Sequence, residues 1–194
     1  MSKAEKTRQF IIEKTAPLFN TRGFAGTSLN DMTAATGLTK GSIYGNFANK
    51  DEVALEAFEC NLNKVENMIR DEMGKERSCR DKLLVYARVY DNFLKSPFPE
   101  GGCPILNTAT EADDTHPGLR ARASTAVTSW KKSIEKLVRK GMEQKEFRRE
   151  TNPEQVALTM IAMIEGAIMI TKLTGKNNYK NSVMLSVEDL VKNL

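Results

Sequence analysis

The sequence predicts an all-α protein of about nine helices. Apolar side chains recur at helical spacing along almost all of its 194 residues, and no stretch shows the period-2 alternation of a half-buried strand. Pro104, Pro117 and Pro153 each stand where a helix is expected to begin. That position suits proline because its missing N–H would have no helical partner there. Gly23 and Gly37 follow helical stretches, as C-terminal caps do.

The first part of the chain is expected to form one long helix and then a short one. The long helix runs from Lys3 to about Thr21, and Gly23 ends it. The short helix runs from Leu29 to Thr36, with Thr27-Ser28 in front of it to supply an N-cap hydroxyl. The tight turn after it is assigned to Gly37, which can adopt a left-handed conformation without strain.

A second short helix is expected directly after this turn. Thr39 is its N-cap, and Leu38 before the cap with Ile43 inside the helix fits a hydrophobic staple, which fixes the angle at which the chain enters the helix. Ile43 and Phe47 are four residues apart and therefore give this helix one buried face.

The rest of the chain is expected to be helical too. Asn49 caps the next helix, and Glu52 occupies the capping-box position. The segment 96–104, SPFPEGGCP, is the most irregular one and the best candidate for a mobile element. Beyond the first three, helices are expected at residues 50–73, 79–95, 104–114, 117–143, 153–174 and 178–193.

Composition excludes several classes of protein. With 40% hydrophobic and 28% charged residues, the chain falls among soluble globular proteins. Three distant cysteines and one histidine supply neither a disulfide framework nor a structural zinc site. We therefore expect no bound metal and a reducing compartment. The N-terminus lacks the apolar block of a signal peptide. The most apolar run, Val156 to Thr171, contains Glu165 and is shorter than the roughly 20 residues of a membrane span. We therefore expect a cytoplasmic protein without membrane contact.

Positive charge is concentrated at one end of the chain. Residues 1–50 contain seven basic and three acidic residues, which accounts for the whole net charge of +4. Such an asymmetry is the electrostatic pattern expected of a surface that binds a polyanion.

Two short helices around Gly37, followed by a longer one, form a helix-turn-helix pattern over residues 27–47. Its second helix is polar on the outer side, where an amine or hydroxyl can reach base edges and phosphates. Lys50, at a helix N-terminus, is placed to favour a phosphate. The alternative is that Thr27 and Thr39 only cap helices and the lysines are merely solvated. The candidate DNA-contacting residues are Thr27, Ser28, Thr39, Lys40, Gly41, Ser42, Tyr44, Asn46 and Lys50.

The string GFAGTSLNDMTAATGLTKGSIYGNFANKDEV, from Gly23 to Val53, resembles the N-terminal signature of the tetracycline-repressor family of bacterial regulators. The Thr-Lys-Gly-Ser-Ile-Tyr run from Thr39 to Tyr44 follows the family pattern, as do Phe47 and the Lys-x-Glu from Lys50 to Glu52. Gly45-Asn46 departs from it, since the family more often has an aromatic residue or histidine there.

This resemblance implies a DNA-binding domain, residues 1–50, followed by a helical ligand-binding and dimerisation domain, residues 51–194. It also implies a homodimer on a pseudo-palindromic operator, released by a small-molecule effector. We predict a repressor, although residues that bind DNA do not determine the sign of regulation. The candidate effector-binding residues are Phe58, Leu62, Tyr86, Tyr90, Phe93, Cys103, Asn107, Glu111, Trp130, Met163 and Glu165, each of which an ordinary helical core would also explain.

Dimerisation is assigned to the last two helices. The helix expected at 153–174 is apolar on nearly all sides, so that one side can face its own core and another a partner. The final helix is amphipathic. An intramolecular bundle alone would account for much of this pattern.

Two single residues suggest special roles. Glu165 interrupts an apolar helix, where an acid is costly unless it is paired or protonated. It is expected to form a structural pair, with a cationic ligand as the alternative. Cys103 is expected to cap the helix that begins at Pro104; a thiol at a helix N-terminus can become a reactive thiolate, which leaves a redox or electrophile sensor as an alternative.

Two other classes of protein remain as rivals. An enzyme is disfavoured because one histidine and no glycine-rich nucleotide loop supply no catalytic constellation, and neither catalytic residues nor a cofactor are expected. A helical interaction module that binds no nucleic acid is opposed by the segregation of charge.

Overall fold

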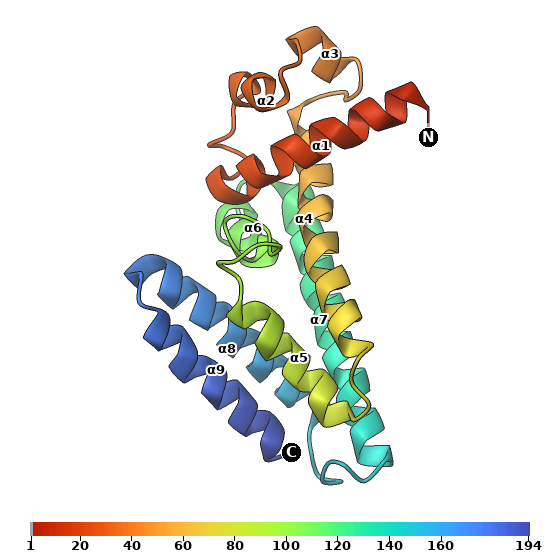
Figure 1. Ribbon diagram of the computed structural model, residues 1–194, viewed down its shortest axis with the longest axis vertical. Helices are drawn as coiled ribbons and strands as arrows, with labels where there is room; N and C mark the ends of the chain where they lie inside the picture. The colour runs from red at the N-terminus through yellow and green to blue at the C-terminus, as the bar shows by residue number, and fades with distance from the viewer. Residues whose placement is uncertain (1) are drawn as a thin grey trace. The chain divides into compact units, whose positions relative to one another are not determined.

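The computed structural model describes residues 2–194, and within this range the chain forms nine helices and no strand (Figure 1). This confirms the predicted all-α class. The helices are α1 (Lys3–Arg22), α2 (Leu29–Thr36), α3 (Lys40–Tyr44), α4 (Lys50–Met73), α5 (Cys79–Asp91), α6 (Pro104–Ala112), α7 (Pro117–Glu143), α8 (Pro153–Thr174) and α9 (Asn177–Lys192).

Local sequence rules account for most of these bounds. Ser2 caps α1 and Ser28 caps α2, each with an acidic partner three residues on that completes a capping box. Thr39 caps α3 by accepting from the Ser42 N–H, and Asn49 accepts the Glu52 N–H at the start of α4. The helices expected at 50–73, 117–143 and 153–174 have the predicted bounds.

Three helices end earlier than predicted, and of these α9 differs least, with its end at Lys192 rather than 193. The α5 helix stops at Asp91 rather than near 95, because Asn92 and Phe93 donate to carbonyls only three residues back and the chain tightens out of the α-helix. Leu94 is 60% exposed, so burial offers no reason to continue the helix. The α6 helix stops at Ala112 rather than 114.

Tertiary contacts divide the described residues into two compact units. The N-terminal unit contains the residues up to Val65 together with Ser96–Ser124, and the C-terminal unit contains Glu66–Lys95 with Thr125–Leu194. The division between the two units falls within α4 and α7. The boundary between residues 50 and 51 was predicted to separate DNA binding from effector binding and dimerisation, and it stays a prediction.

The N-terminal unit has a small apolar core to which its first four helices contribute. Ile11 and Ile12 of α1, Met32 of α2, Ile43 of α3 and Val53 of α4 pack together, joined by Phe47. Phe19, Leu29 and Leu38 lie at the edge of this cluster. The core therefore fixes α3 through its buried side and leaves its other side to solvent.

In the C-terminal unit, α8 packs along α9, and α5 also packs on α9. The α8 helix has 22 residues and is therefore longer than the apolar run, Val156 to Thr171, that was judged too short for a membrane span. By length and composition alone, α8 could cross a membrane. Core helices have the same length and composition. Within α8, 44% of the most apolar window is buried inside the protein, and its buried face includes Met160, Ile164 and Ile168.

Candidate nucleic-acid interface

Gly37 makes the turn between α2 and α3. Its backbone is left-handed, with φ 69° and ψ 9°, and its N–H donates to the Thr33 carbonyl at 2.9 Å. A Cβ at this position would meet no atom within 4 Å, so conformation and not space calls for glycine. The turn brings α3 back against the same core as α2.

The α3 helix is only five residues long and is held from below. Ile43 is fully buried and Phe47 is 2% exposed, while Leu38 packs against the same cluster from the other side of the Thr39 cap. A helix this short is not stable by itself in water. Its orientation is therefore set by these apolar contacts, as the predicted staple requires.

The opposite side of α3 is polar and exposed. Thr39, Lys40, Gly41 and Tyr44 are all exposed, and no atom lies within 4 Å of the space in front of Gly41. An ammonium, a hydroxyl and a phenol thus surround a backbone that another molecule can approach closely, which is the chemistry that base edges and phosphates need. Ser42 is half-buried at the side of this surface.

Asn46, the second residue of the departure from the family pattern, has a structural use. Its side-chain amide donates to the Ser42 carbonyl at 2.8 Å, and its own carbonyl accepts from Arg8. The side chain is half-buried. Asn46 therefore closes the end of α3 in this structure, and a contact of its side chain with DNA stays a prediction.

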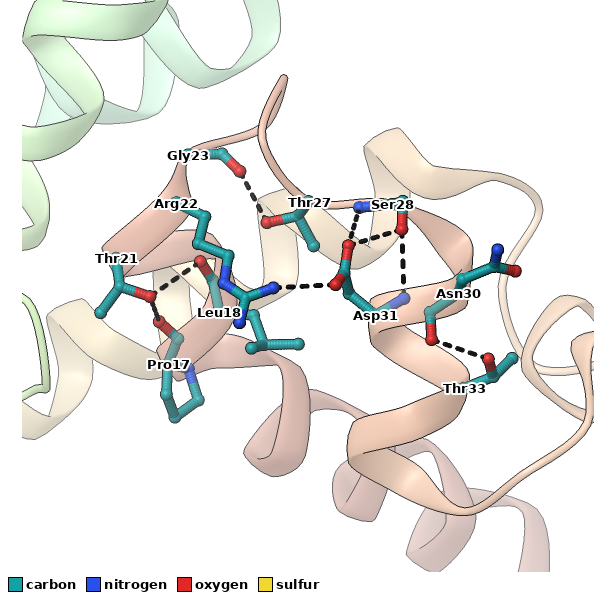
Figure 2. A network of polar contacts seen from close by, with 10 residues as sticks. All are labelled: Pro17, Leu18, Thr21, Arg22, Gly23, Thr27, Ser28, Asn30, Asp31 and Thr33. Atoms are coloured by element: carbon teal, nitrogen blue, oxygen red, sulfur yellow. Dashed lines mark hydrogen bonds and ion pairs between the residues drawn. The ribbon is translucent and has the colours of Figure 1, made fainter.

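Thr27 does not fit its predicted role. Its side chain is fully buried, and its hydroxyl donates to the Gly23 carbonyl at 2.7 Å (Figure 2). A phosphate cannot reach a hydroxyl in this position, so the expected phosphate contact at Thr27 is wrong for this arrangement. Ser28 is the N-cap of α2 instead, and it is exposed.

Asp31 and Arg22 form an ion pair beside this cap, with Nη1 and Oδ1 2.8 Å apart (Figure 2). Hydrogen bonds from the Ser28 hydroxyl and N–H hold the pKa of the Asp31 carboxyl below its ordinary value, and Arg22 lowers it further. The only acid of α2 therefore has its charge partly compensated close to the expected DNA surface.

Arg8 is the residue that sequence reasoning missed. Its guanidinium lies 4.1 Å from the centre of the Phe47 ring, donates to the Asn46 carbonyl, and pairs with Glu52 at 2.5 Å and with Glu56. The hydrogen bond to Glu56 is the main reason that the Arg8 pKa is raised. Arg8 thus ties α1 to the end of α3 and the start of α4.

This network changes the meaning of the charge count. Arg8 is one of the seven basic residues before position 51, but its partners Glu52 and Glu56 lie beyond that position. The Glu52 pKa is lowered by the Ala48 N–H first and by Arg8 second. Some of the N-terminal excess of positive charge is therefore neutralised by ion pairs within the protein. Lys50 is half-buried, with its Nζ 4.2 Å from the centre of the Phe24 ring.

The candidate effector-binding residues separate into two groups. Phe58, Leu62, Cys103, Asn107 and Glu111 belong to the N-terminal unit, and the other six belong to the C-terminal unit. In the first group, Phe58 and Glu111 line a cavity of about 20 Å³, and the Asn107 amide donates to the carbonyls of Asn20 and Gly101.

The second group contains an aromatic stack. Tyr90 lies parallel to Trp130, with centroids 5.0 Å apart and an interplanar angle of 10°, and Tyr86 lies 6.0 Å from the same indole. Burial raises the pKa of Tyr86. Trp130 is 8% exposed, and its indole N–H has no hydrogen-bond acceptor among the described residues. Phe93 is buried, and Met163 and Glu165 are half-buried on α8.

The cysteines differ from the prediction at one point. Cys103 is the N-cap residue of α6, but its side chain makes no capping hydrogen bond and is fully buried. Burial raises the pKa of Cys60 and of Cys79. Among residues 2–194, no group of three metal-binding side chains comes together.

Two short helices joined by a glycine turn, the second with a buried apolar side and an exposed polar side, form a helix-turn-helix typical of DNA-binding proteins. Comparison with known proteins specifies which kind. The profile described as "Bacterial regulatory proteins, tetR family" matches residues 11–57, and the profile described as "Tetracyclin repressor-like, C-terminal domain" matches residues 79–187. The chain belongs to the tetracycline-repressor family of DNA-binding transcriptional regulators.

Two solved structures of this family are similar to the protein in sequence and in fold over nearly the whole chain. A crystal structure of a TetR-family regulator from Cytophaga hutchinsonii is 49% identical with a TM-score of 0.95, and one from Chloroflexus aurantiacus J-10-FL is 34% identical with a TM-score of 0.93. Each comparison covers 98% of this chain and 96% of the other. The transcriptional repressor DhaR of Mycobacterium sp. (strain GP1) is 25% identical over 169 residues, 86% of this chain and 82% of its own length.

Proposed function

We propose that this regulator is a cytoplasmic repressor that binds a pseudo-palindromic operator as a homodimer and leaves it when a small molecule binds. Repression is supported by the similarity to DhaR, which is named as a repressor. The observation that carries the proposal is α3, whose buried side is fixed by Ile43 and whose exposed side presents Lys40 and Tyr44. Regulators of this family bind DNA rather than catalyse a reaction, which also disfavours an interaction module without nucleic acid.

The proposed DNA-contacting residues are chosen for their exposure, except for Lys50, which is half-buried at the N-terminus of α4. We assign base and phosphate contacts to Thr39, Lys40, Gly41 and Tyr44, with Ser28 and Lys50 placed toward the flanking phosphates. Two identical heads on one dimer would recognise half-sites about one DNA helical turn apart, which gives the selectivity that a single five-residue helix lacks.

Selection of duplexes from a random pool tests this function directly. The wild-type protein is expected to enrich a palindromic site, and Lys40→Ala and Tyr44→Ala are expected to weaken its binding. Loss of a phosphate contact at Lys40 would also lower the slope of log affinity against log salt by about one. Lys136→Ala removes an equal charge from an exposed position on α7 and serves as the control. Enrichment of no site by the wild type would refute the proposal.

The dimer is assigned to an apolar surface on α8 and α9. Leu158, Met169 and Leu173 of α8 are exposed at spacings that place them along one face, with 80% exposure at Leu173. Gly166 lies on the same face, and a Cβ there would meet nothing within 4 Å. On α9, Leu185 is 57% exposed. Long apolar side chains around a small residue suit close helix packing by a second copy.

The effector site is assigned to the aromatic stack of the C-terminal unit. A buried indole N–H without an acceptor costs about 1–3 kcal/mol, which an acceptor on a bound ligand would recover. The parallel rings of Tyr90 and Trp130 favour a flat molecule beside them. We therefore expect an aromatic effector that carries a carbonyl or carboxylate oxygen. A thiol-based signal through Cys103 is disfavoured because its side chain is fully buried.

Trp130 is the only tryptophan of the chain, so its fluorescence reports on this site alone. Flat aromatic acceptors such as naphthoate and coumarin are expected to shift or quench its emission and to release the selected operator. Trp130→Phe keeps the aromatic packing and removes the N–H, and it should weaken release of DNA. If such ligands release DNA equally well from Trp130→Phe, the effector lies elsewhere.

A further inference from the structure

Glu111 of α6 holds the backbone between α1 and α2. Its two carboxylate oxygens accept the N–H groups of Phe24 and Ala25, one each, at 2.8 Å. These donors lie in the α1–α2 turn, residues 23–28, which leads directly to the N-cap of α2. A charged acceptor shared by two adjacent backbone donors fixes both the position and the direction of this turn.

Gly23 shows how closely the carboxylate approaches. A Cβ on Gly23 would lie 2.2 Å from Oε2 and 2.5 Å from Oε1 of Glu111. The backbone of Gly23 has φ 73° and ψ −179°, a region open essentially only to glycine and distinct from the left-handed helical cap expected from the sequence. Both the conformation and the space in front of Gly23 are therefore matched to Glu111.

A second set of hydrogen bonds ties α6 to the end of α1. The Asn107 amide donates to the Asn20 carbonyl at 3.0 Å. The Asn20 amide donates in return to the carbonyls of Glu100 and Gly102, at 2.7 and 2.9 Å. Asn20 is 7% exposed, so these bonds are shielded from water. Thus α6 and the segment before it are hydrogen-bonded to the end of α1 at two separate points.

The ring of Phe24 is held as well. It meets the His116 ring edge-on, with centroids 4.5 Å apart, and His116 Nε2 lies 3.0 Å from Asp51 Oδ1 at the start of α4. The nearby cavity lined by Phe19, Phe58 and Glu111 has a volume of about 20 Å³, room for about one water molecule. The turn has little space in which to shift while α6 stays in place.

We propose that Glu111 is the positioning residue through which α6 sets the orientation of the α1–α2 turn, and hence of α2 and α3, on DNA. The turn lies in the N-terminal family profile, residues 11–57, and Glu111 lies in the C-terminal one, residues 79–187. The inference rests on the proposed function, because orientation on DNA matters only if this surface binds an operator.

The test is the affinity of Glu111→Gln for the duplex enriched by the wild type. An amide oxygen can replace only one of the two acceptors, and its NH₂ group then faces the other donor. We expect operator affinity to fall about tenfold while binding to random DNA is unchanged. Electrostatics alone predicts the opposite sign, since loss of an acid favours a polyanion. Asp114→Asn removes the same charge three residues away at an exposed site and should not weaken binding.

A second variant and a direct measurement complete the test. Gly23→Ala should weaken operator binding more in the wild type than in Glu111→Ala, because only the former contains the carboxylate that its Cβ would strike. Amide exchange should show Phe24 and Ala25 protected in the wild type and not in Glu111→Ala. Equal operator affinity in Glu111→Gln, or unprotected amides in the wild type, would overturn the inference. Failure of the wild type to enrich any duplex would instead overturn the proposed function.

Discussion

The α3 helix and the α8–α9 surface expose opposite kinds of side chain. On α3 the apolar residues Ile43 and Phe47 are buried, and the exposed residues include Lys40 and Tyr44. On α8 the exposed residues include Leu158, Met169 and Leu173. A polar exposed surface is well solvated and suits a charged ligand, whereas an apolar exposed surface favours packing against another protein surface. The two kinds of binding therefore have different chemical signatures in one chain.

The two regions also differ in how they are held. Five residues of α3 depend on contacts from elsewhere in the chain, including Arg8 from α1. The α8 helix, of 22 residues, packs on α9 and has an apolar buried face that includes Met160, Ile164 and Ile168. Removal of one polar contact should therefore disturb α3 more than any single exposed change disturbs α8.

The largest expected effect comes from the α8 surface. Met169→Glu with Leu173→Glu places two charges where a second copy is proposed to pack, and we expect a monomer in sedimentation equilibrium. Loss of bivalent binding should lower operator affinity on the order of a hundredfold or more. Ser129→Glu adds a charge at an exposed site on α7 and should leave the dimer intact. A double variant that stays dimeric would remove this surface from the interface.

Two neighbouring residues of α3 separate stability from binding. Ile43→Ala leaves a cavity under α3, and we expect the free energy of unfolding to fall by about 3 kcal/mol, measured by urea denaturation. Tyr44→Ala should change stability by no more than about 0.5 kcal/mol and yet weaken operator binding. Similar unfolding curves for both variants would contradict the view that Ile43 anchors the helix.

Acid should loosen the Arg8 network. Because the pKa of Glu52 is lower in the folded protein than its ordinary value, its charged form stabilises the fold at neutral pH. This contribution is present above the ordinary pKa and disappears as the pH falls through the folded value. The difference in unfolding temperature between the wild type and Glu52→Gln should therefore shrink from pH 7 to pH 3. Glu143→Gln, at an exposed site on α7, provides the control. A constant difference would show that the charge of Glu52 is not involved.

The smallest expected effect is that of thiol modification on operator binding. It compares the two units because each contains a cysteine with a raised pKa. Burial raises the pKa of Cys60 in the N-terminal unit and of Cys79 in the C-terminal unit, and Cys103 is fully buried. Because the thiolate is the reactive form, iodoacetamide at pH 7 should label the native protein slowly and leave operator affinity unchanged. Mass spectrometry would follow the labelling. Rapid modification of Cys103 that releases DNA would restore the thiol sensor.

Sequence rules predicted what depends on neighbouring residues. The bounds of α2, the cap at Thr39 and the anchor at Ile43 each follow from residues within a few positions, and the structure confirms them. Thr27 shows the limit of this approach. A hydroxyl before a helix suggests a cap or a phosphate contact, but here it donates to a carbonyl four residues earlier, in a turn whose path local rules do not specify.

Long-range contacts were beyond prediction from the sequence. Arg8 bonds to Glu56 across 48 positions, and Glu111 bonds to Phe24 across 87. Neither pair has a spacing signal, since each depends on how separate helices pack. Glu111 was predicted as one of the effector-binding residues, and the structure shows its carboxylate bonded to the α1–α2 turn. Which residues touch DNA or an effector stays a prediction.

The place of α6 in the N-terminal unit has a consequence for exchanging modules between regulators. A fragment that ends at residue 57, where the N-terminal family profile stops, would leave the Asn20 amide and the Phe24 and Ala25 N–H groups without their acceptors. A hybrid that joins this fragment to a foreign effector domain would need a glutamate at the place of Glu111. Hybrids that carry residues 96–124 together with residues 1–65 keep these bonds, and we expect them to retain operator binding.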